Sequence, residues 1–501
     1  MKRVFVRELK PYSVADIARL MEANRDRARS AIERLLAGGI ICYRSGHPSG
    51  SPDFPEENAT SADELYQFNW VGLAMVEDWI FVCYPKYLQN DSLTEKEIER
   101  HMILVLQVLR HQQKTDRMER MAVGDLRSSN KLPAMLRLLE LLDEHGEYSN
   151  YERTYEVNGT GNIDWNRTIN EHLPTIFHKR PIYTDLKTRR THRDNSDYIT
   201  RLHRAILTEC SQLLAECGIV EMLGLSEIWL SDERVEDLGD DESLRWRIER
   251  ERSTQFITWK QDVLDAMMLY LFDRKTNIEH ETVQSLGTST FCHLWEAACK
   301  IAFGDLLPKR LRQLPLPLAD SWREKSEQSL LGIIPRPIWE RVHDDGYAFC
   351  GDVATLIPDT IAFFGDGDAM KFCIYDAKYY VPSDVGKMVG QPGVEPVLKQ
   401  FSYQSAYRDF ILDHKFASVV NAFLVPGNID APRKMAHVSF PGVLIGESAP
   451  FSNYVDMWIL PAKDIYEAYL RGETLKLSSN PLRYQQSAES GTASQRAWYP
   501  G

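Results

Sequence analysis

Long apolar runs, paired cysteines and an excess of basic residues are all missing from this 501-residue sequence. No run of 18 or more apolar residues occurs, and the N-terminus lacks an apolar stretch of signal-peptide length. We therefore expect no membrane span and no secretion signal. The eight cysteines include no CxxC pair, which argues against a zinc ribbon, and most have the apolar neighbours of small buried residues. A reducing, cytoplasmic compartment is the simplest interpretation.

Acidic residues outnumber basic residues, so the formal net charge is −13. This charge counts against a passive, wholly basic coat for nucleic acid. It does not exclude a site of metal-binding carboxylates, and basic surface can be local. Two such patches are Lys187–Arg193 and the group Lys309, Arg310 and Arg312. Either could touch phosphates, although a solvated loop or helix end is the plainer interpretation.

The first 60 residues have the element order of a winged helix. Ser13 is a predicted N-cap, Gly38-Gly39 would end a second helix, and residues 40–43 are typical of a strand. Four arginines lie on or near the second helix, which is the DNA-recognition helix in many winged-helix domains: Arg25, Arg27, Arg29 and Arg34. The same module often makes only protein contacts, so both roles stay open. Residues 46–63, rich in Pro, Gly and Ser, predict an exposed linker.

Residues 61–285 predict a hairpin followed by a mainly helical middle domain. The hairpin strands would be 66–76 and 79–84, turning at Glu77-Asp78. We expect helices at about 94–113, 130–144, 196–217 and 243–273, with an irregular insert at 150–190.

The pattern changes in residues 286–475, where short apolar runs alternate with helices. Helices are expected at 289–303, 320–331, 396–411 and 462–471, and strands at 347–357, 360–365, 371–377, 417–425, 436–445 and 454–460. This alternation predicts an α/β sheet domain, followed by a polar tail at 476–501. The expected fold class is therefore multidomain α+β: a winged-helix-like N-terminal region, a helical middle and a C-terminal α/β domain.

Two strands of this last domain each run into a carboxylate. Residues 356–361 contain Asp359, and residues 372–378 contain Asp376 and Lys378. A turn at Gly365-Asp366-Gly367 would return the chain as an antiparallel strand and bring the two acids together. Asp376 and Lys378 are two residues apart, so on a strand they share a face. Two acids and an ammonium suit a Mg²⁺ site that hydrolyses phosphodiesters, the PD-(D/E)xK arrangement. The same sequence pattern would occur if Asp359 were only a turn residue and Asp376 and Lys378 formed a surface ion pair.

Glu296 is a candidate third metal ligand. Its helical neighbours Cys292, Cys299 and Phe303 are apolar, and a carboxylate on such a face needs a partner. A metal ion would be one partner, and Lys300 at i+4 would be another. We keep both interpretations.

The helix after the DxK strand carries a polar face. Gln400, Tyr403, Gln404 and Tyr407 have the spacing of one helix face, which suits holding metal-bound water or a phosphate. Of these we assign Gln400 to the catalytic set. Ordinary packing of the helix on the sheet explains the two tyrosines equally well. Tyr379 and Tyr380 follow the lysine and could simply cap the edge of the core.

These residues resemble the LlaJI-type restriction endonucleases, relatives of the McrC nuclease subunits. The resemblance lies in Leu356–Asp359, Ile374–Tyr380 and the helix Lys399–Tyr403, and extends to further stretches over roughly residues 65–460: Phe68–Gly72, Tyr84–Tyr87, Tyr155–Ile169 and Arg180–Tyr183. It implies a PD-(D/E)xK fold and cleavage of double-stranded DNA in restriction of foreign DNA. Carried over, the metal ligands are Asp359, Asp376 and Glu296, and Lys378 is the catalytic lysine.

The resemblance also implies Mg²⁺, or Mn²⁺ in its place, and an AAA+ GTPase or ATPase partner of McrB type. No GxxxxGK[ST] motif occurs in the chain, so a partner would supply any nucleotide hydrolysis. A homo-oligomer stays open, and we expect no membrane partner. The segment Asn158–Thr168 is interpreted from its residues as a structural loop that packs Trp165.

Two other functions compete with a nuclease of a defence system. The chain could be a DNA- or protein-binding adaptor whose nuclease-like domain does not cleave, although the intact acid–acid–lysine set argues against this. It could also be a repair nuclease that acts on branched or single-stranded DNA.

Overall fold

The computed structural model describes most of the chain, namely residues 1–44, 64–89, 93–121, 131–216, 218–223, 225–272, 283–343, 346–352, 355–365, 367–382, 390–441, 448–475, 477–480 and 483–484. It is a mixed α+β protein of two compact units, each assembled from separate segments. The first unit contains Met1–Arg3, Ala74–Ile80 and Asp125–Leu286, and the second contains Val4–Leu73, Phe81–Gly124 and Gly287–Gly501. The linker predicted at 46–63 lies outside the described residues.

The first unit is built on helices whose apolar faces pack together: α4 (Lys131–His145), α6 (Tyr198–Glu216), α7 (Ile219–Met222), α8 (Asp241–Thr254) and α9 (Thr258–Phe272). The helix predicted at 243–273 is in fact two helices, because the chain turns extended at Gln255 after α8. The Gln255 side-chain carbonyl then accepts from the amides of Phe256 and Ile257, at 3.1 Å each.

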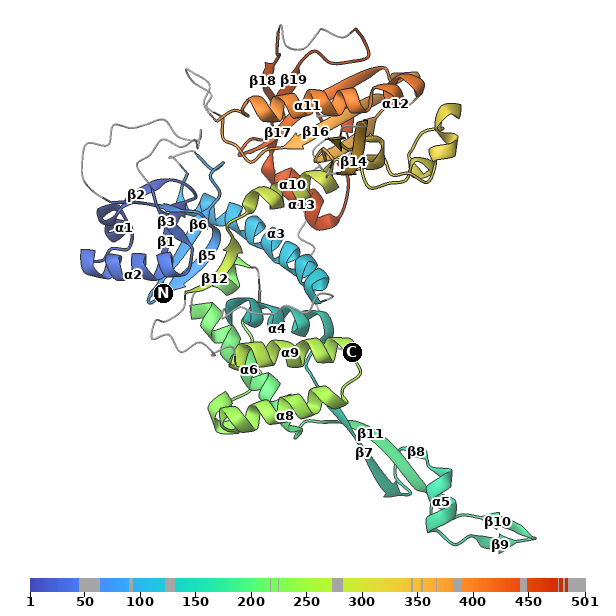
Figure 1. The fold of residues 1–501 in the computed structure, drawn as a ribbon. Coiled ribbons are helices and arrows are strands. Elements are labelled where there is room, and N and C mark those ends of the chain that lie inside the picture. The colour runs from blue at the N-terminus through green and yellow to red at the C-terminus, as the bar shows by residue number, and fades with distance from the viewer. Residues whose placement is uncertain are drawn as a thin grey trace. The chain divides into compact units, whose positions relative to one another are not determined.

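A long arm leaves these helices, where the sequence predicted an irregular insert (Figure 1). It consists of β7 (Asn150–Val157), β8 (Asn162–Ile163), α5 (Trp165–Glu171), β9 (Thr175–Phe177), β10 (Arg180–Ile182) and β11 (Lys187–Asp194). β11 pairs antiparallel with β7 and β8, and β10 pairs with β9. His178 and Lys179 both have positive φ, as the tight turn of a two-residue hairpin requires. The strands of the arm are mostly exposed on both faces, so no buried face imposes an alternation of polar and apolar residues that would have predicted them.

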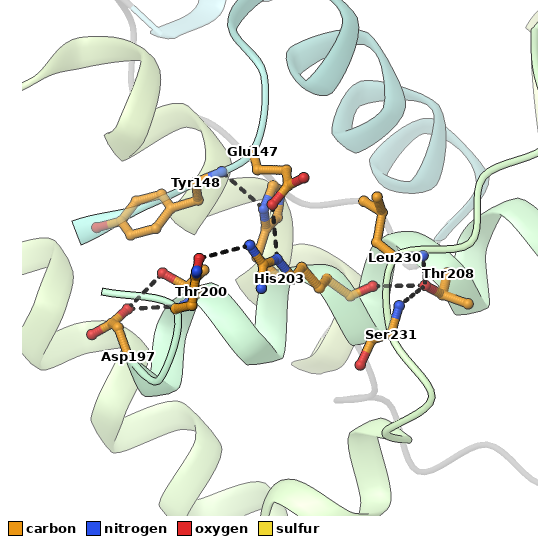
Figure 2. Close-up of polar contacts among 10 residues, drawn as sticks. Glu147, Tyr148, Asp197, Thr200, His203, Thr208, Leu230 and Ser231 are labelled. Carbon is orange, nitrogen blue, oxygen red and sulfur yellow. Dashed lines mark hydrogen bonds and ion pairs between the residues drawn. The ribbon is translucent and has the colours of Figure 1, made fainter. Parts of the chain in front are cut away.

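Hydrogen bonds fix the root of the arm to the helices (Figure 2). Buried His203 accepts at Nδ1 from the amide of Tyr148, which lies just before β7. Arg204 donates to Glu147 at 2.8 Å, also just before β7. Further along α6, Thr208 Oγ1 accepts from the amides of Leu230 and Ser231 and holds the segment after α7 rather than the arm. The arm therefore starts from a backbone held in place by α6.

The N-terminal segment has the predicted helix–turn–helix–strand order. It comprises β2 (Pro11–Ser13), α1 (Val14–Leu20), α2 (Arg25–Ala37), β3 (Ile41–Tyr43) and β4 (Leu65–Phe68), with the strands in the order β2-β4-β3. Ser13 caps α1 as predicted, since its Oγ accepts from the amide of Asp16. The strand predicted at 66–76 is wrong as one piece. It is divided between β4 and β5 (Val71–Val76), which belong to different sheets. β5 and β6 (Trp79–Tyr84) turn at Glu77-Asp78 as expected and share a sheet with β1 (Lys2–Arg7) and β12 (Gln284–Thr288).

The core of the second unit is a five-stranded mixed sheet of order β15-β16-β17-β19-β18. Its strands are β15 (Thr360–Phe364), β16 (Lys371–Ala377), β17 (Ser418–Gly427), β18 (Arg433–Val438) and β19 (Val455–Pro461). β15 and β18 run antiparallel to their neighbours, while β16, β17 and β19 are parallel.

Helices cover both faces of this sheet. Phe372 and Ile374 of β16 pack with Tyr403, Tyr407 and Phe410 from α11 (Val394–Ala406) and α12 (Arg408–Asp413) and the residues that join them. The alternate residue Tyr375 packs against Phe303, at the end of α10 (Phe291–Ala302), so α10 lies on the opposite face. α13 (Ala462–Arg471) packs against α10. α3 (Glu95–Met121), which Thr94 and Glu97 cap, packs against α13.

The remaining segments of this unit are short. The helix predicted near 320–331 is wrong: Asp320–Lys325 and Leu331–Ile333 form separate 3₁₀ turns, and proline-rich connections precede them. β13 (Ile338–His343) pairs with β14 (Gly346–Asp352), and β20 (Leu477–Asn480) pairs with β21 (Arg483–Tyr484) within the predicted tail. The rest of that tail lies outside the described residues.

No helix in the described ranges combines the length and apolar character that a membrane crossing needs. Four cysteines are buried as predicted: Cys83, Cys210, Cys299 and Cys373. Cys292 is exposed instead.

Candidate active site

Asp359, Asp376 and Lys378 meet at one end of the β15–β16 hairpin. Thr360 pairs with Tyr375, so the register places Asp359 opposite Asp376. Gly365 and Gly367 both have positive φ in the connecting turn, which glycine adopts without strain. The hairpin predicted from the sequence is therefore present, and it brings both carboxylates to one strand end.

Hydrogen bonds hold the three side chains together. Asp359 Oδ2 accepts from the backbone amide of Ala377 at 2.9 Å. Lys378 Nζ donates to Asp376 Oδ1 at 2.7 Å, and the Asp376 side chain is only 8% exposed. The Lys378 amide donates to the carbonyl of Leu424 at 2.8 Å and extends the pairing with β17 beyond the end of β16.

Burial and the second carboxylate raise the pKa of Asp359 to about 8. Burial disfavours the charged form, and the hydrogen bond and negative charge of Asp376 act in the same direction. Burial alone would lower the pKa of Lys378, but the adjacent Asp376 outweighs it and raises that pKa. The lysine therefore stays an ammonium beside Asp376, while Asp359 resists ionisation.

Asp305 explains why Asp359 lies where it does. Its Oδ1 accepts from the amide of Ile361 and from the amide of Leu307, both at 3.0 Å. The loop after α10 is thereby clamped to the start of β15, two residues beyond Asp359. Sequence reasoning missed this residue, because its partner is 56 positions away.

Gln400 lies on the same face of the sheet as the two acids. Its backbone carbonyl accepts from Asn421 Nδ2 at 3.2 Å, and Asn421 pairs in register with Ile374, two residues before Asp376. The Gln400 side chain is fully buried, and neither atom of its amide has a hydrogen-bond partner in the described structure. The sequence offered one overlooked sign of Asn421, a lone amide within the apolar strand β17.

The other members of the polar helix face have structural partners. Gln404 exchanges two hydrogen bonds with the backbone of Ser452, and Tyr407 donates to the carbonyl of Leu330. Tyr403 donates to the carbonyl of Ile357, and its pKa is raised by burial and by the charges of Asp376 and Asp359. Tyr403 is thus near the acids and also holds residues 355–358, which precede β15 and do not form the strand predicted at 347–357.

Glu296 is paired with Lys300, whose Nζ donates to its Oε1 at 2.6 Å. Its charge contributes to the raised pKa of Asp359, so it lies on the side of α10 near the site. Within the described residues, no three His, Cys, Asp or Glu side chains are gathered closely enough to hold a metal ion. A metal role for Glu296 stays a prediction.

Two other predicted features have clear positions. Arg310 and Arg312 both pair with Glu327, so one carboxylate offsets part of the positive charge of this patch. Asn158 has positive φ and fixes the arm, accepting from the amide of Leu186 at 2.8 Å. We predicted that the segment Asn158–Thr168 packs Trp165, but Trp165 is 54% exposed, so that part of the prediction is wrong.

Fold and site thus define a mixed α+β protein with an acid–acid–lysine constellation at a sheet edge. The family profile described as LlaJI restriction endonuclease matches residues 70–438. The chain belongs to the LlaJI restriction endonuclease family, as its motifs suggested.

Individual relatives are more distant. The type II restriction enzyme BsuMI component YdjA of Bacillus subtilis (strain 168) is 25% identical over 334 residues, 66% of this chain and 64% of that protein. The chain thus spans slightly less than two thirds of the length of this curated relative.

Two solved structures from Thermococcus gammatolerans also match. The half-complex of McrB AAA+ hexamers with bound McrC covers 94% of this chain and 99% of that chain, at 12% identity and a TM-score of 0.38. The McrBC complex covers 54% and 79%, at 14% identity and a TM-score of 0.22. These TM-scores are too low to support an argument about this chain.

Proposed function

We propose that this chain is a Mg²⁺-dependent endonuclease subunit of a restriction or anti-phage system and hydrolyses phosphodiester bonds of double-stranded DNA. The observation that carries the proposal is the meeting of Asp359, Asp376 and Lys378 at one strand end. Family membership supports it. The mixed sheet with helices on both faces fits a PD-(D/E)xK domain.

The donor set fits a hard divalent cation such as Mg²⁺, or Mn²⁺ in its place. Mg²⁺ is commonly held by one or two carboxylates, with water and substrate phosphate as the other ligands. Asp359 and Asp376 supply two carboxylates, and burial together with the nearby charge of Asp376 raises the pKa of Asp359. A cation between them would offset that charge. When bound, it would polarise the scissile phosphate and acidify a water molecule.

Lys378 has two tasks in this proposal. Its ammonium, held on Asp376 at 2.7 Å, would orient the attacking water and stabilise negative charge that develops on the phosphate. Gln400 would add a buried amide that can donate and accept, because its side chain has no partner within the described residues.

The same proposal includes an NTP-hydrolysing partner of the AAA+ class. The sequence lacks a phosphate-binding GxxxxGK[ST] loop, so the chain itself would not supply nucleotide hydrolysis. The arm offers a surface for a protein partner, because it exposes large apolar side chains far from any core: Trp165, Ile169, Leu173, Ile176, Phe177 and Ile182. Leu173 is 97% exposed.

Plasmid cleavage with Mg²⁺, with and without the AAA+ partner, tests the proposal. We expect Asp376→Asn and Lys378→Met each to lower the cleavage rate at least 100-fold. A matched ion pair on the same sheet serves as the control, because Lys434 Nζ lies 2.7 Å from Asp456 Oδ1 on β18 and β19. Lys434→Met should leave the rate within about threefold.

The outcome separates the alternatives. Undiminished cleavage by both site variants would remove these residues from the mechanism. DNA binding without cleavage in any condition would favour the adaptor function, for which Arg25, Arg27 and Arg29 are exposed on α2. Preference for branched or single-stranded DNA in competition with duplex would favour repair.

A further inference from the structure

Tyr379 follows Lys378 directly and points to the other side of the extended chain. Lys378 reaches Asp376, whereas the ring of Tyr379 packs against Phe291 of α10, with 5.3 Å between ring centroids. Successive side chains of an extended backbone alternate in this way. Tyr379 is 7% exposed, so it holds the strand end from behind the site.

The hydroxyl of Tyr379 is bound by a residue from the beginning of the chain. It donates to Glu8 Oε2 at 2.5 Å, and the same oxygen accepts from the amide of Lys86 at 3.1 Å. Glu8 follows β1 and is 8% exposed. A buried carboxylate is costly without such donors, so this contact is specific rather than incidental.

The surroundings of this contact restrict the Tyr379 ring. Lys86 Nζ lies 4.9 Å from the ring centroid, and the Tyr87 ring stands edge-on at 6.4 Å. Lys86 is itself 5% exposed. Burial, with the charge of Glu8, raises the pKa of Tyr379 well above its ordinary value, so the phenol remains a donor at any working pH.

We propose that Glu8 is a positioning residue for Lys378: through Tyr379 it anchors the strand end that carries the lysine. The inference rests on the proposed nuclease function for its effect on rate, but the anchoring itself does not depend on that function. The segment predicted as a separate winged-helix-like region would then contribute, through the strand before it, to the geometry of the active site.

The variant Tyr379→Phe tests this with little change in packing, because it keeps the ring and removes only the donor. In the full-length chain with its partner, we expect kcat for plasmid cleavage to fall about tenfold. The KM for DNA and the half-saturating Mg²⁺ concentration should stay within twofold, since Asp359 and Asp376 are untouched. Glu8→Ala should act like Tyr379→Phe, and Glu8→Gln, which keeps an acceptor oxygen, should recover most of the rate.

The chain contains a matched control. Tyr66 also donates its hydroxyl to a glutamate, Glu64, at 2.8 Å and is 4% exposed, but it lies on β4. Tyr66→Phe should leave kcat unchanged. An equal loss in both phenylalanine variants, or an unchanged kcat in Tyr379→Phe, would overturn the proposal.

Hydrogen exchange gives a readout that does not need cleavage. The amide of Lys378 is protected by its bond to Leu424, and we expect faster exchange of the peptide 376–380 in Tyr379→Phe and Glu8→Ala but not in Tyr66→Phe. If the wild-type chain cleaves nothing, the nuclease function fails while exchange still decides the anchoring. Unchanged exchange in Tyr379→Phe would refute the anchoring even in an active enzyme.

Discussion

The backbone amide of Ala377 donates to Oδ2 of Asp359 at 2.9 Å, across the two strands that carry the candidate site. This bond locks the end of the β15–β16 register, in which Thr360 faces Tyr375. A slip of one residue would turn Asp359 to the opposite face of the sheet, away from Asp376. The site thus depends on a strand register as well as on three side chains.

Gln400 should show opposite effects on stability and on activity. A fully buried amide without partners costs about 1–3 kcal/mol of folding free energy, so Gln400→Met should stabilise the protein by roughly that amount. If the amide serves catalysis, the same variant should lower the cleavage rate about 10- to 100-fold. Chemical denaturation and plasmid cleavage check the two effects. Higher stability with full activity would remove Gln400 from the catalytic set.

Glu296 and Lys300 can be separated by single substitutions. If Glu296 binds metal, Glu296→Gln should raise the half-saturating Mg²⁺ concentration about tenfold. Lys300→Met removes only the competing partner at 2.6 Å and should leave that concentration equal or lower. Mg²⁺ titrations of cleavage measure both. If Glu296 only forms an ion pair with Lys300, neither variant should change the dependence of cleavage on Mg²⁺.

Asp359 should make the metal-free protein less stable as pH rises. Its pKa is about 8 in the folded state against an ordinary value of 3.8, so between these limits the folded chain binds a proton that the unfolded chain has lost. The resulting stabilisation is complete below about pH 4 and is lost by about pH 8, at roughly 1 kcal/mol per pH unit.

Denaturation in EDTA at pH 6, 7 and 8 measures that slope. Asp359→Asn should flatten it and stabilise the protein at pH 8, while Asp456→Asn on the same sheet should leave it in place. Excess Mg²⁺ should reverse the trend for the wild type, since the ion requires the ionised pair. A slope unaltered by Asp359→Asn would contradict this assignment.

His203 predicts an acid sensitivity of the first unit. Burial, with the nearby Arg204, lowers its pKa to about 3 from an ordinary 6.5. Below pH 6.5, His203 therefore binds a proton in the unfolded chain but not in the folded chain. Stability should be complete above about pH 6.5 and fall toward pH 3, by up to about 1.4 kcal/mol per unit.

Thermal unfolding between pH 5 and 8 tests the role of His203. His203→Leu should lower stability at pH 8, because the Tyr148 amide loses its acceptor, but should weaken the dependence on pH. His178→Gln, in the exposed turn of the arm, is the matched control and should keep the wild-type dependence. An identical dependence in all three proteins would show that another group titrates.

Local signals in the sequence predicted many elements correctly. Ser13 predicted the start of α1, Gly38-Gly39 the end of α2, and Gly365 with Gly367 the turn between β15 and β16. Each works because the capping or turn partner lies within a few residues. The predictions failed where the deciding contact is distant, as in the division of residues 66–76 between two sheets and in the arm.

The sequence by itself determined the hairpin of Asp359 and Asp376, the lysine beside them and the polar face of α11, since periodicity and turn chemistry are local. Only the tertiary structure decided that Asp305 clamps Ile361, that the Gln400 amide is buried without a partner and that Glu8 binds Tyr379. Such contacts join residues up to 371 positions apart. They form because burial forces polar groups to find partners wherever the fold brings them, and no local pattern encodes that choice.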